Sequence, residues 1–323
     1  MDQEFNYEFF VIGGGSGGLA AASAAAAKGV KVGLADFVKP SPQGTKWGLG
    51  GTCVNVGCIP KKLFHYTSLL GEAKEDLTEA GWKVDNQAPN NWEEVSTRIT
   101  DHIRSLNWGY RKKLNEENIT YHNKLARLLS ANKIELKDAE GNIETVTAKY
   151  ILLATGGRPS DPGIPGKEHA INSDDIFWMS KPPGRTLCVG ASYIALECGG
   201  FLHGMGMDVT IMVRSILLRG FDQQIAGKIG DYMATQGVKF IKKAVPISIT
   251  LNQEGQKVVR FKQGEDEIED VFDTVLFAIG RSADTKGLNL EEVGVKTAKN
   301  GKIIAGDDDK TSVPNIYSIG DVC

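Results

Sequence analysis

The sequence predicts an α/β protein built from two tandem Rossmann-like dinucleotide-binding domains. A strand at residues 9–12 leads into the glycine-rich turn 13–18 and then into an alanine-rich helix. A second strand at 186–189 leads into a similar turn at 190–195, where two of the glycines are replaced by serine and alanine. One G-x-G-x-x-G is weak evidence, but strand, turn and helix in that order, twice, are typical of paired nucleotide-binding folds.

The two copies also end alike. Each copy closes on an apolar strand followed by glycine, at 150–156 and at 274–280. The alternating segment 133–148 predicts a β-meander inserted in the first copy, which gives a three-layer ββα arrangement. Residues 87–121 carry the apolar spacing of a helix, and the acidic run 264–270 predicts a solvated hairpin tip. A cluster of proline and glycine residues at 159–166 marks the boundary between the two copies.

Composition excludes several classes of protein. The chain has 323 residues, a net charge of −3 and 24% charged residues, which gives no electrostatic reason to expect nucleic acid or a membrane surface. No apolar run approaches the roughly 20 residues that span a bilayer. Five cysteines are an odd number, which argues against a secreted disulfide scaffold. The acidic start of the sequence is unlike a secretory or organellar presequence. These features predict a cytoplasmic protein without a metal site.

The residues after the second strand of each copy separate the two ligands. In copy one, Asp36 stands about 20 residues past the glycines, where a carboxylate accepts hydrogen bonds from a free ribose 2′-hydroxyl and repels a 2′-phosphate. In copy two, Arg214 and Arg219 come after the corresponding strand. Two guanidinium groups at that place suit a 2′-phosphate, so copy two is predicted to bind NADPH.

A pair of cysteines lies downstream of the first glycine turn. Cys53 and Cys58 are five positions apart, and Pro60 suits the first turn of a helix. Cys58 is then expected at a helix N-terminus, where the helix dipole favours the thiolate. The alternative is a structural disulfide or two buried free cysteines. A thiol pair beside a nucleotide site favours redox chemistry.

With these residues in view, the chain resembles the pyridine nucleotide–disulfide oxidoreductases, and among them the large thioredoxin reductases that are built like glutathione reductase. The resemblance covers the whole chain. It rests on the motifs at 53–58, 154–159, 190–197 and 319–321, and on the long segment 36–48 before the cysteines. Gly157 and the ending 320–323 look more like glutathione reductase, which is the alternative within the enzyme class.

The resemblance implies a set of FAD-binding residues in copy one. They surround the pyrophosphate, the adenosine ribose, the ribitol and the flavin ring, and they are Gly13, Gly15, Ser16, Gly17, Gly18, Asp36, Thr52, Cys58, Lys61, Ala126, Thr155, Gly156 and Asp321. Cys58 is implied to touch the flavin, and Cys53 to attack an outside disulfide. Asp321 is implied to bind the pyrophosphate and ribitol region at the end of a strand that returns to the first domain.

A second implied set binds NADPH. It comprises Gly190, Ser192, Tyr193, Ile194, Glu197, Arg214, Arg219, Gly280 and Arg281. Lys61 and Glu197 are implied to pair near flavin N5, and Tyr193 to act as a flap that the nicotinamide displaces. Without the resemblance, Lys61 and Glu197 are ordinary charges on helix surfaces and Tyr193 is a core aromatic. The implied reaction carries hydride from NADPH to FAD, then to the Cys53–Cys58 disulfide, then to thioredoxin or a similar protein disulfide.

The resemblance also implies a domain division. The predicted domains are an FAD domain at 1–163, an NADPH domain at 164–290 and a return segment at 291–323. The family continues with a domain that forms the homodimer and supplies a histidine to the partner's dithiol, and this chain is expected to lack it. The alternative to an incomplete reductase is therefore a non-catalytic short form that binds FAD and NADPH. A monomer is expected, and the five histidines are expected to be structural or surface residues.

Overall fold

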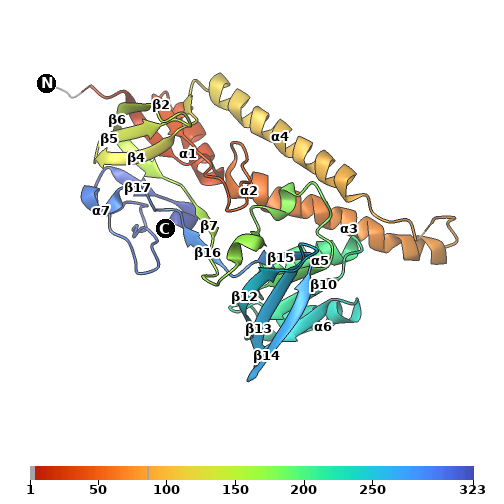
Figure 1. The fold of residues 1–323 in the computed structure, drawn as a ribbon. Coiled ribbons are helices and arrows are strands. Elements are labelled where there is room, and N and C mark those ends of the chain that lie inside the picture. The colour runs from red at the N-terminus through yellow and green to blue at the C-terminus, as the bar shows by residue number, and fades with distance from the viewer. Residues whose placement is uncertain (1–3, 86) are drawn as a thin grey trace.

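The computed structural model describes residues 4–85 and 87–323, and it begins with a parallel sheet. The strand order is β3-β2-β1-β6, and β17 pairs in parallel with the end of β6. The helix after the first glycine turn is α1. Figure 1 shows that the blue C-terminal segment returns to this first unit. The bounds are β1 Tyr7–Ile12, α1 Ser16–Ala26, β2 Val32–Ala35, β3 Thr120–His122, β6 Ile143–Leu153 and β17 Ile316–Ser318.

The long strand β6 also belongs to the inserted meander. Its first half pairs antiparallel with β5 (Lys133–Lys137), which pairs antiparallel with β4 (Leu125–Ser130). The predicted meander is present, and it begins at Leu125 instead of residue 133. The side chains of β4 alternate between buried and exposed, with Ala126 and Leu128 in the core, so the strand has the pattern of a half-buried sheet.

Three helices connect β2 to β3, namely α2 (Gly51–Val56), α3 (Cys58–Glu79) and α4 (Trp92–Glu116). Helix α4 begins five residues later than the predicted start at 87. Its N-cap is Asn91, whose side-chain oxygen accepts a hydrogen bond from the backbone N–H of Glu94. The indole of Trp92 is buried directly after this cap, which fixes where the chain turns into the helix.

The second unit repeats the parallel architecture. Its strand order is β11-β10-β9-β15-β8, and a separate antiparallel meander, β12-β13-β14, extends from it (Figure 1). The fold class predicted from the repeated turns is therefore confirmed. The bounds are β8 Ile171–Asn172, β9 Thr186–Val189, α5 Tyr193–Gly204, β10 Val209–Val213, α6 Gln223–Thr235, β11 Lys239–Lys242, β12 Ala244–Leu251, β13 Lys257–Gln263, β14 Asp266–Phe272 and β15 Thr274–Phe277.

The hairpin tip is shorter than the predicted segment 264–270. Only Gly264 and Glu265 form the turn, and β14 begins at Asp266 and pairs with β13 along its whole length. Acidic residues of β14 lie opposite basic residues of β13, as in the pair Lys262 and Glu267. Cross-strand pairs of opposite charge stabilise antiparallel strands, so the acidic run forms a strand instead of a loop.

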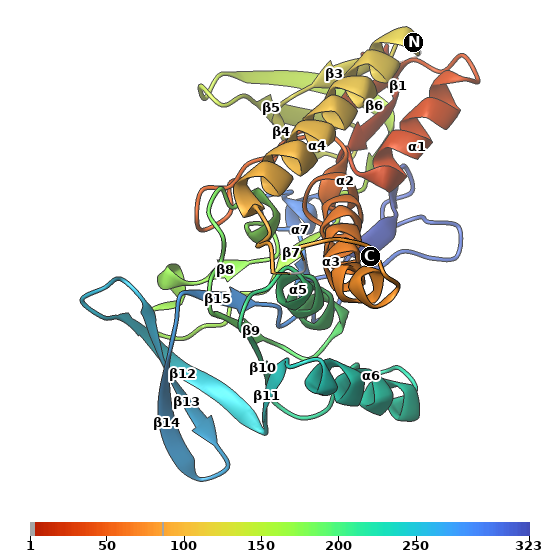
Figure 2. The same cartoon turned by 90° about the vertical axis from the view of Figure 1, so that its right-hand side faces the viewer.

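The two units share a core. The ring of Phe64 on α3 stacks on Trp92 at 5.0 Å and on Phe201 of α5 at 5.2 Å between centroids. Figure 2 shows α3 beside α5. A two-stranded ribbon, β7 with β16, also links the segments that enter and leave the second unit. The remaining bounds are β7 Gly157–Pro159, η1 Lys167–His169, η2 Ile176–Trp178, β16 Arg281–Ala283, α7 Leu290–Val293 and η3 Gly320–Val322.

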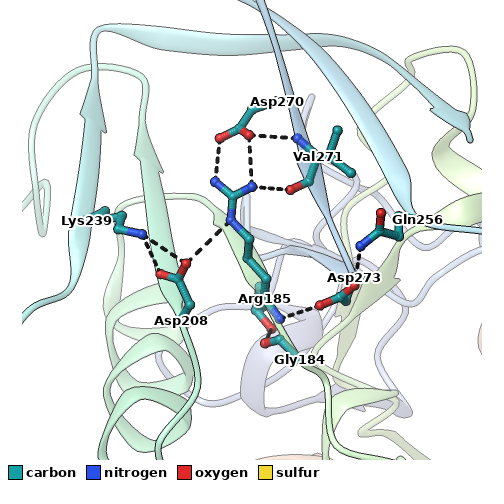
Figure 3. Close-up of polar contacts among 9 residues, drawn as sticks. Gly184, Arg185, Asp208, Lys239, Gln256, Asp270, Val271 and Asp273 are labelled. Carbon is teal, nitrogen blue, oxygen red and sulfur yellow. Dashed lines mark hydrogen bonds and ion pairs between the residues drawn. The ribbon is translucent and has the colours of Figure 1, made fainter. Parts of the chain in front are cut away.

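Arg185 ties the meander of the second unit to its parallel sheet (Figure 3). Its guanidinium forms a bidentate contact with Asp270 at 2.9 and 3.0 Å, lies 3.5 Å from Asp208, and packs 4.7 Å from the ring centre of Phe272. The backbone N–H of Arg185 donates to Asp273 at 2.8 Å. Arg185 therefore joins β14 of the meander to the start of the parallel sheet.

Replacing Arg185 is expected to destabilise the fold. Arg185→Ala removes the bidentate pair and leaves the carboxylate of Asp270 without its arginine, so the free energy of unfolding should fall by about 1–3 kcal/mol. The matched control is Arg260→Ala, because Arg260 pairs with Glu267 on the exposed hairpin, where solvent screens the pair and its contribution to stability is small. Urea unfolding followed by circular dichroism measures both. Equal losses for the two variants would contradict the joining role of Arg185.

Within residues 4–85 and 87–323, no helix combines the length and the apolar character needed to cross a bilayer.

Candidate active site at the dithiol cavity

The two glycine turns have the same geometry. Gly13 has φ +113° and Gly190 has φ +141°, and in each case a Cβ would lie 2.2 Å from a carbonyl oxygen, of Ala154 or of Ala278 respectively. Only glycine fits where the backbone takes positive φ and a neighbouring strand approaches so closely. The repeat inferred from the sequence thus extends to individual backbone contacts.

The C-terminal ends of the strands of the first sheet open onto a cavity of about 580 Å³. It extends to both cysteines and to the N-terminal end of α5. The sequence-predicted residues that line it are Gly13, Gly15, Ser16, Gly17, Asp36, Thr52, Cys53, Cys58, Lys61, Ala126, Thr155, Gly156, Tyr193, Ile194, Glu197, Arg281 and Asp321. Residues more than 260 positions apart, such as Cys53 and Asp321, therefore face one space.

Six predicted residues do not line this cavity. Gly18 packs behind the first turn, where a Cβ would lie 1.9 Å from the carbonyl oxygen of Gly13. Arg214 and Arg219 are exposed on the loop after β10, and Arg219 donates to the Ser215 hydroxyl at 2.8 Å. The other three belong to the turns of the second unit and are Gly190, Ser192 and Gly280. The roles predicted for all six remain predictions.

The carboxylate of Asp36 stands at the end of β2 beside the glycine turn. Its Oδ1 accepts a hydrogen bond from the backbone N–H of Gly14 at 2.8 Å. Burial raises the pKa of Asp36, and the Gly14 hydrogen bond opposes that effect. Burial also raises the pKa of Tyr121 to about 12, with a further contribution from the charge of Asp36. The site thus presents a partly buried acceptor on the cavity wall, where a ribose hydroxyl could reach it.

The two helices α2 and α3 bring the cysteines together. Gly57, with φ −146° and ψ −117°, interrupts the helix between them, so Cys58 becomes the first residue of α3. Both cysteines are free thiols in this structure, which is the reduced form of the predicted pair. Burial, followed by the hydrogen bond to Cys58 and the charge of that neighbour, raises the pKa of Cys53 to about 11.

The raised pKa of Cys53 predicts how its reactivity depends on pH. The thiolate is the reactive species, so at neutral pH only a small fraction of Cys53 reacts. Alkylation of reduced Cys53 by iodoacetamide should accelerate about tenfold per pH unit from pH 7 to pH 10, whereas free glutathione should level off above its own pKa. Peptide mass spectrometry measures the rate at Cys53. A plateau below pH 9 would show that its pKa is not raised.

An ion pair bridges α3 and α5 at the cavity wall. Nζ of Lys61 lies 2.8 Å from Oε1 of Glu197, so the predicted contact is present. Tyr193, the first residue of α5, is half exposed at the same wall. The proximity of this pair to a flavin and the motion of the tyrosine stay predictions.

One contact between predicted residues, and several further residues of the site, were not predicted from the sequence. Nη2 of Arg281 donates to the Thr52 hydroxyl at 3.2 Å, which links β16 to the residue before Cys53. Lys39, Trp47 and Arg158 also line the cavity. Arg158 lies in the 154–159 motif, and Lys39 and Trp47 lie in the segment 36–48 before the cysteines, so the sequence signals near these residues were present although no role was predicted for them.

None of the five histidines lines the cavity. His122 instead accepts or donates a hydrogen bond at the Tyr7 hydroxyl and lies 3.2 Å from Glu144. Within residues 4–85 and 87–323 no three histidine, cysteine or acidic side chains gather as metal ligands would.

The chain belongs to the pyridine nucleotide–disulphide oxidoreductase family, whose model matches residues 7–323. It is similar to thioredoxin reductase SEP1 of Emiliania huxleyi, with 51% identity over 322 residues. The match takes in 99% of this chain and 64% of that protein, so the chain spans less than two thirds of the length of this curated relative.

Proposed function

We propose that this chain is the flavin- and NADPH-binding part of a thioredoxin reductase, in which Cys53 and Cys58 are the redox pair. The observation that supports it is the position of the pair on the wall of the cavity that also holds Asp36, Asp321 and the glycine turn. The overall reaction takes NADPH, a proton and a disulfide to NADP⁺ and two thiols. FAD, when bound, accepts the hydride and supplies an electron pair to the disulfide.

The cavity has the features that an extended dinucleotide needs. The N-termini of α1 and α2 meet there, and a Cβ on Gly51 would lie 2.6 Å from the Cα of Gly15, so only backbone faces this place. Backbone N–H groups at a helix N-terminus bind phosphate. The ribose and ribitol would be bound by Asp36 and Asp321, at different parts of the wall.

The remaining side chains are assigned roles around the redox pair. Cys58 would face the flavin and Cys53 would exchange with the outside disulfide. Lys61, held by Glu197, would place a positive charge beside the flavin ring. Tyr193 would cover the side from which the nicotinamide enters, and Arg214 and Arg219 would bind the 2′-phosphate. Thioredoxin as the substrate, a monomeric state and a cytoplasmic location are parts of the same proposal.

The test is anaerobic reduction of the FAD-loaded chain. In the oxidised chain, one equivalent of NADPH should generate two new thiols while the flavin returns to its oxidised form, and a second equivalent should bleach the visible absorbance of the flavin. The thiols are counted after unfolding with a chromogenic disulfide reagent. The proposal fails if the chain takes up no FAD, or if the reduced flavin forms while the number of thiols stays constant.

A further inference from the structure

The segment between β2 and α2 has two parts that differ in their surroundings. We call residues 36–48 the strap. Its start at 36–39 and Trp47 near its end line the cavity, whereas the residues between them do not. The strap has no regular secondary structure, so contacts with other parts of the chain must hold it in place.

The middle of the strap folds into a tight turn whose two hydroxyls donate to one buried carboxylate. The backbone N–H of Ser41 donates to the carbonyl of Thr45 at 2.9 Å. The hydroxyls of Ser41 and Thr45 both donate to Oδ1 of Asp175, at 2.5 and 2.6 Å. Oδ2 of Asp175 accepts from the backbone N–H of Asn172 at 3.1 Å. Asp175 is 3% exposed, so its charge is stabilised mainly by these donors.

Asp174, the residue before Asp175, binds an arginine that contacts both ends of the strap. Oδ2 of Asp174, which is also buried, accepts from Nε of Arg158 at 2.9 Å. Nη1 of Arg158 donates to the carbonyl of Lys39 at 3.0 Å, and the guanidinium lies 4.7 Å from the ring centre of Trp47. The arginine therefore contacts both of the places at which the strap faces the cavity.

A third contact holds the strap from outside. Nε2 of Gln43 donates to the carbonyls of Glu168 and Ala170, at 2.7 and 2.6 Å. These carbonyls and the two aspartates all belong to residues 168–175, which lead into β9 of the second unit. The strap comes from the first unit, so the hydrogen bonds of Ser41, Thr45 and Gln43 cross to a segment that contains β8 of the second unit.

We infer that the acidic pair Asp174 and Asp175 anchors the strap as the outer wall of the cavity, and that Asp175 is a positioning residue for cofactor retention. Asp175 touches neither the cavity nor the cysteines. It acts through Ser41 and Thr45, which fix the path of the strap between Asp36 and Trp47. Without the anchor, the strap regains conformational freedom, and a bound dinucleotide must restrict that freedom again on binding. This inference rests on the proposed function in taking the cavity as the FAD site.

The test compares Asp175→Ala, Asp175→Asn and the unchanged chain. Without cofactor, trypsin should cleave the Lys46–Trp47 bond about tenfold faster in Asp175→Ala, because cleavage requires the strap to leave the wall. After loading with FAD, the rise of flavin fluorescence on dilution should also be about tenfold faster. Asp175→Asn keeps one carbonyl oxygen for the two hydroxyls, so both of its rates should lie between those of Asp175→Ala and those of the unchanged chain. Asp231→Ala, an exposed carboxylate on α6, is the matched control and should change neither rate.

A second variant covers the case in which Asp175→Ala does not fold. Gln43→Ala changes an exposed side chain and should move both rates in the same direction by a smaller factor. Rates equal to those of Asp231→Ala in both variants would overturn the inference. Failure of the unchanged chain to take up FAD would overturn the proposed function, while the trypsin comparison would still decide whether Asp175 anchors the strap.

Discussion

Cys58→Ser should abolish NADPH-driven formation of thiols while leaving reduction of the flavin intact. Cys58 begins α3 and lines the cavity that Lys61 and Glu197 border, and it is the sulfur proposed to face the flavin. A serine hydroxyl neither forms a disulfide with Cys53 nor ionises near neutral pH. The rate of disulfide reduction should therefore fall by at least about a thousandfold.

Thiol counting separates this effect from a general loss of structure. The unchanged chain has five cysteines, so its oxidised form should show three thiols and its reduced form five. Cys58→Ser should show four thiols before and after NADPH. Cys323→Ser is the matched control, because it removes a cysteine outside the pair and should still gain two. A gain of two thiols in Cys58→Ser would remove Cys58 from the redox pair.

The second large effect concerns the choice between NADPH and NADH. Replacing Arg214 and Arg219 together by alanine should raise the KM for NADPH by at least about 100-fold, because each charge-assisted hydrogen bond to the 2′-phosphate contributes roughly 1.5–3 kcal/mol. The KM for NADH should change by no more than about twofold, since NADH carries no group for these guanidiniums. Both values come from steady-state reduction of a quinone by the FAD-loaded chain.

The control for this pair is a variant with two other exposed basic residues of the second unit changed. Lys239→Ala combined with Arg260→Ala alters the net charge equally but lies away from the loop after β10. It should leave the ratio of the two KM values unchanged. Equal losses for NADPH and NADH in the Arg214 and Arg219 variant would exclude these arginines as ligands of the 2′-phosphate.

Local sequence signatures predicted the parts of the site that depend on neighbouring residues. The glycine turn, Asp36 and the two cysteines each lie within or directly after an element whose type the sequence indicates. Their convergence on one cavity results from the parallel sheet, because the C-terminal ends of its strands share an edge. The start of α4 was missed because the cap at Asn91 and the burial of Trp92 decide it.

The contacts that could not be predicted join distant segments. Ser41 and Asp175 are 134 positions apart, and Thr52 and Arg281 are 229 apart. No pattern within either segment predicts which residue it will contact, because such contacts depend on how the two units pack together. The prediction of a hairpin tip over the whole of 264–270 was wrong for a similar reason, since the opposite strand β13 decides whether these residues pair.

The aromatic stack of Phe64 between Trp92 and Phe201 has a consequence for the chain as a whole. Splitting the polypeptide near residue 163 would expose apolar rings on both fragments, so neither half should keep its shape in isolation. Heating the intact chain should accordingly produce a single cooperative melting transition, in which the two halves are lost together.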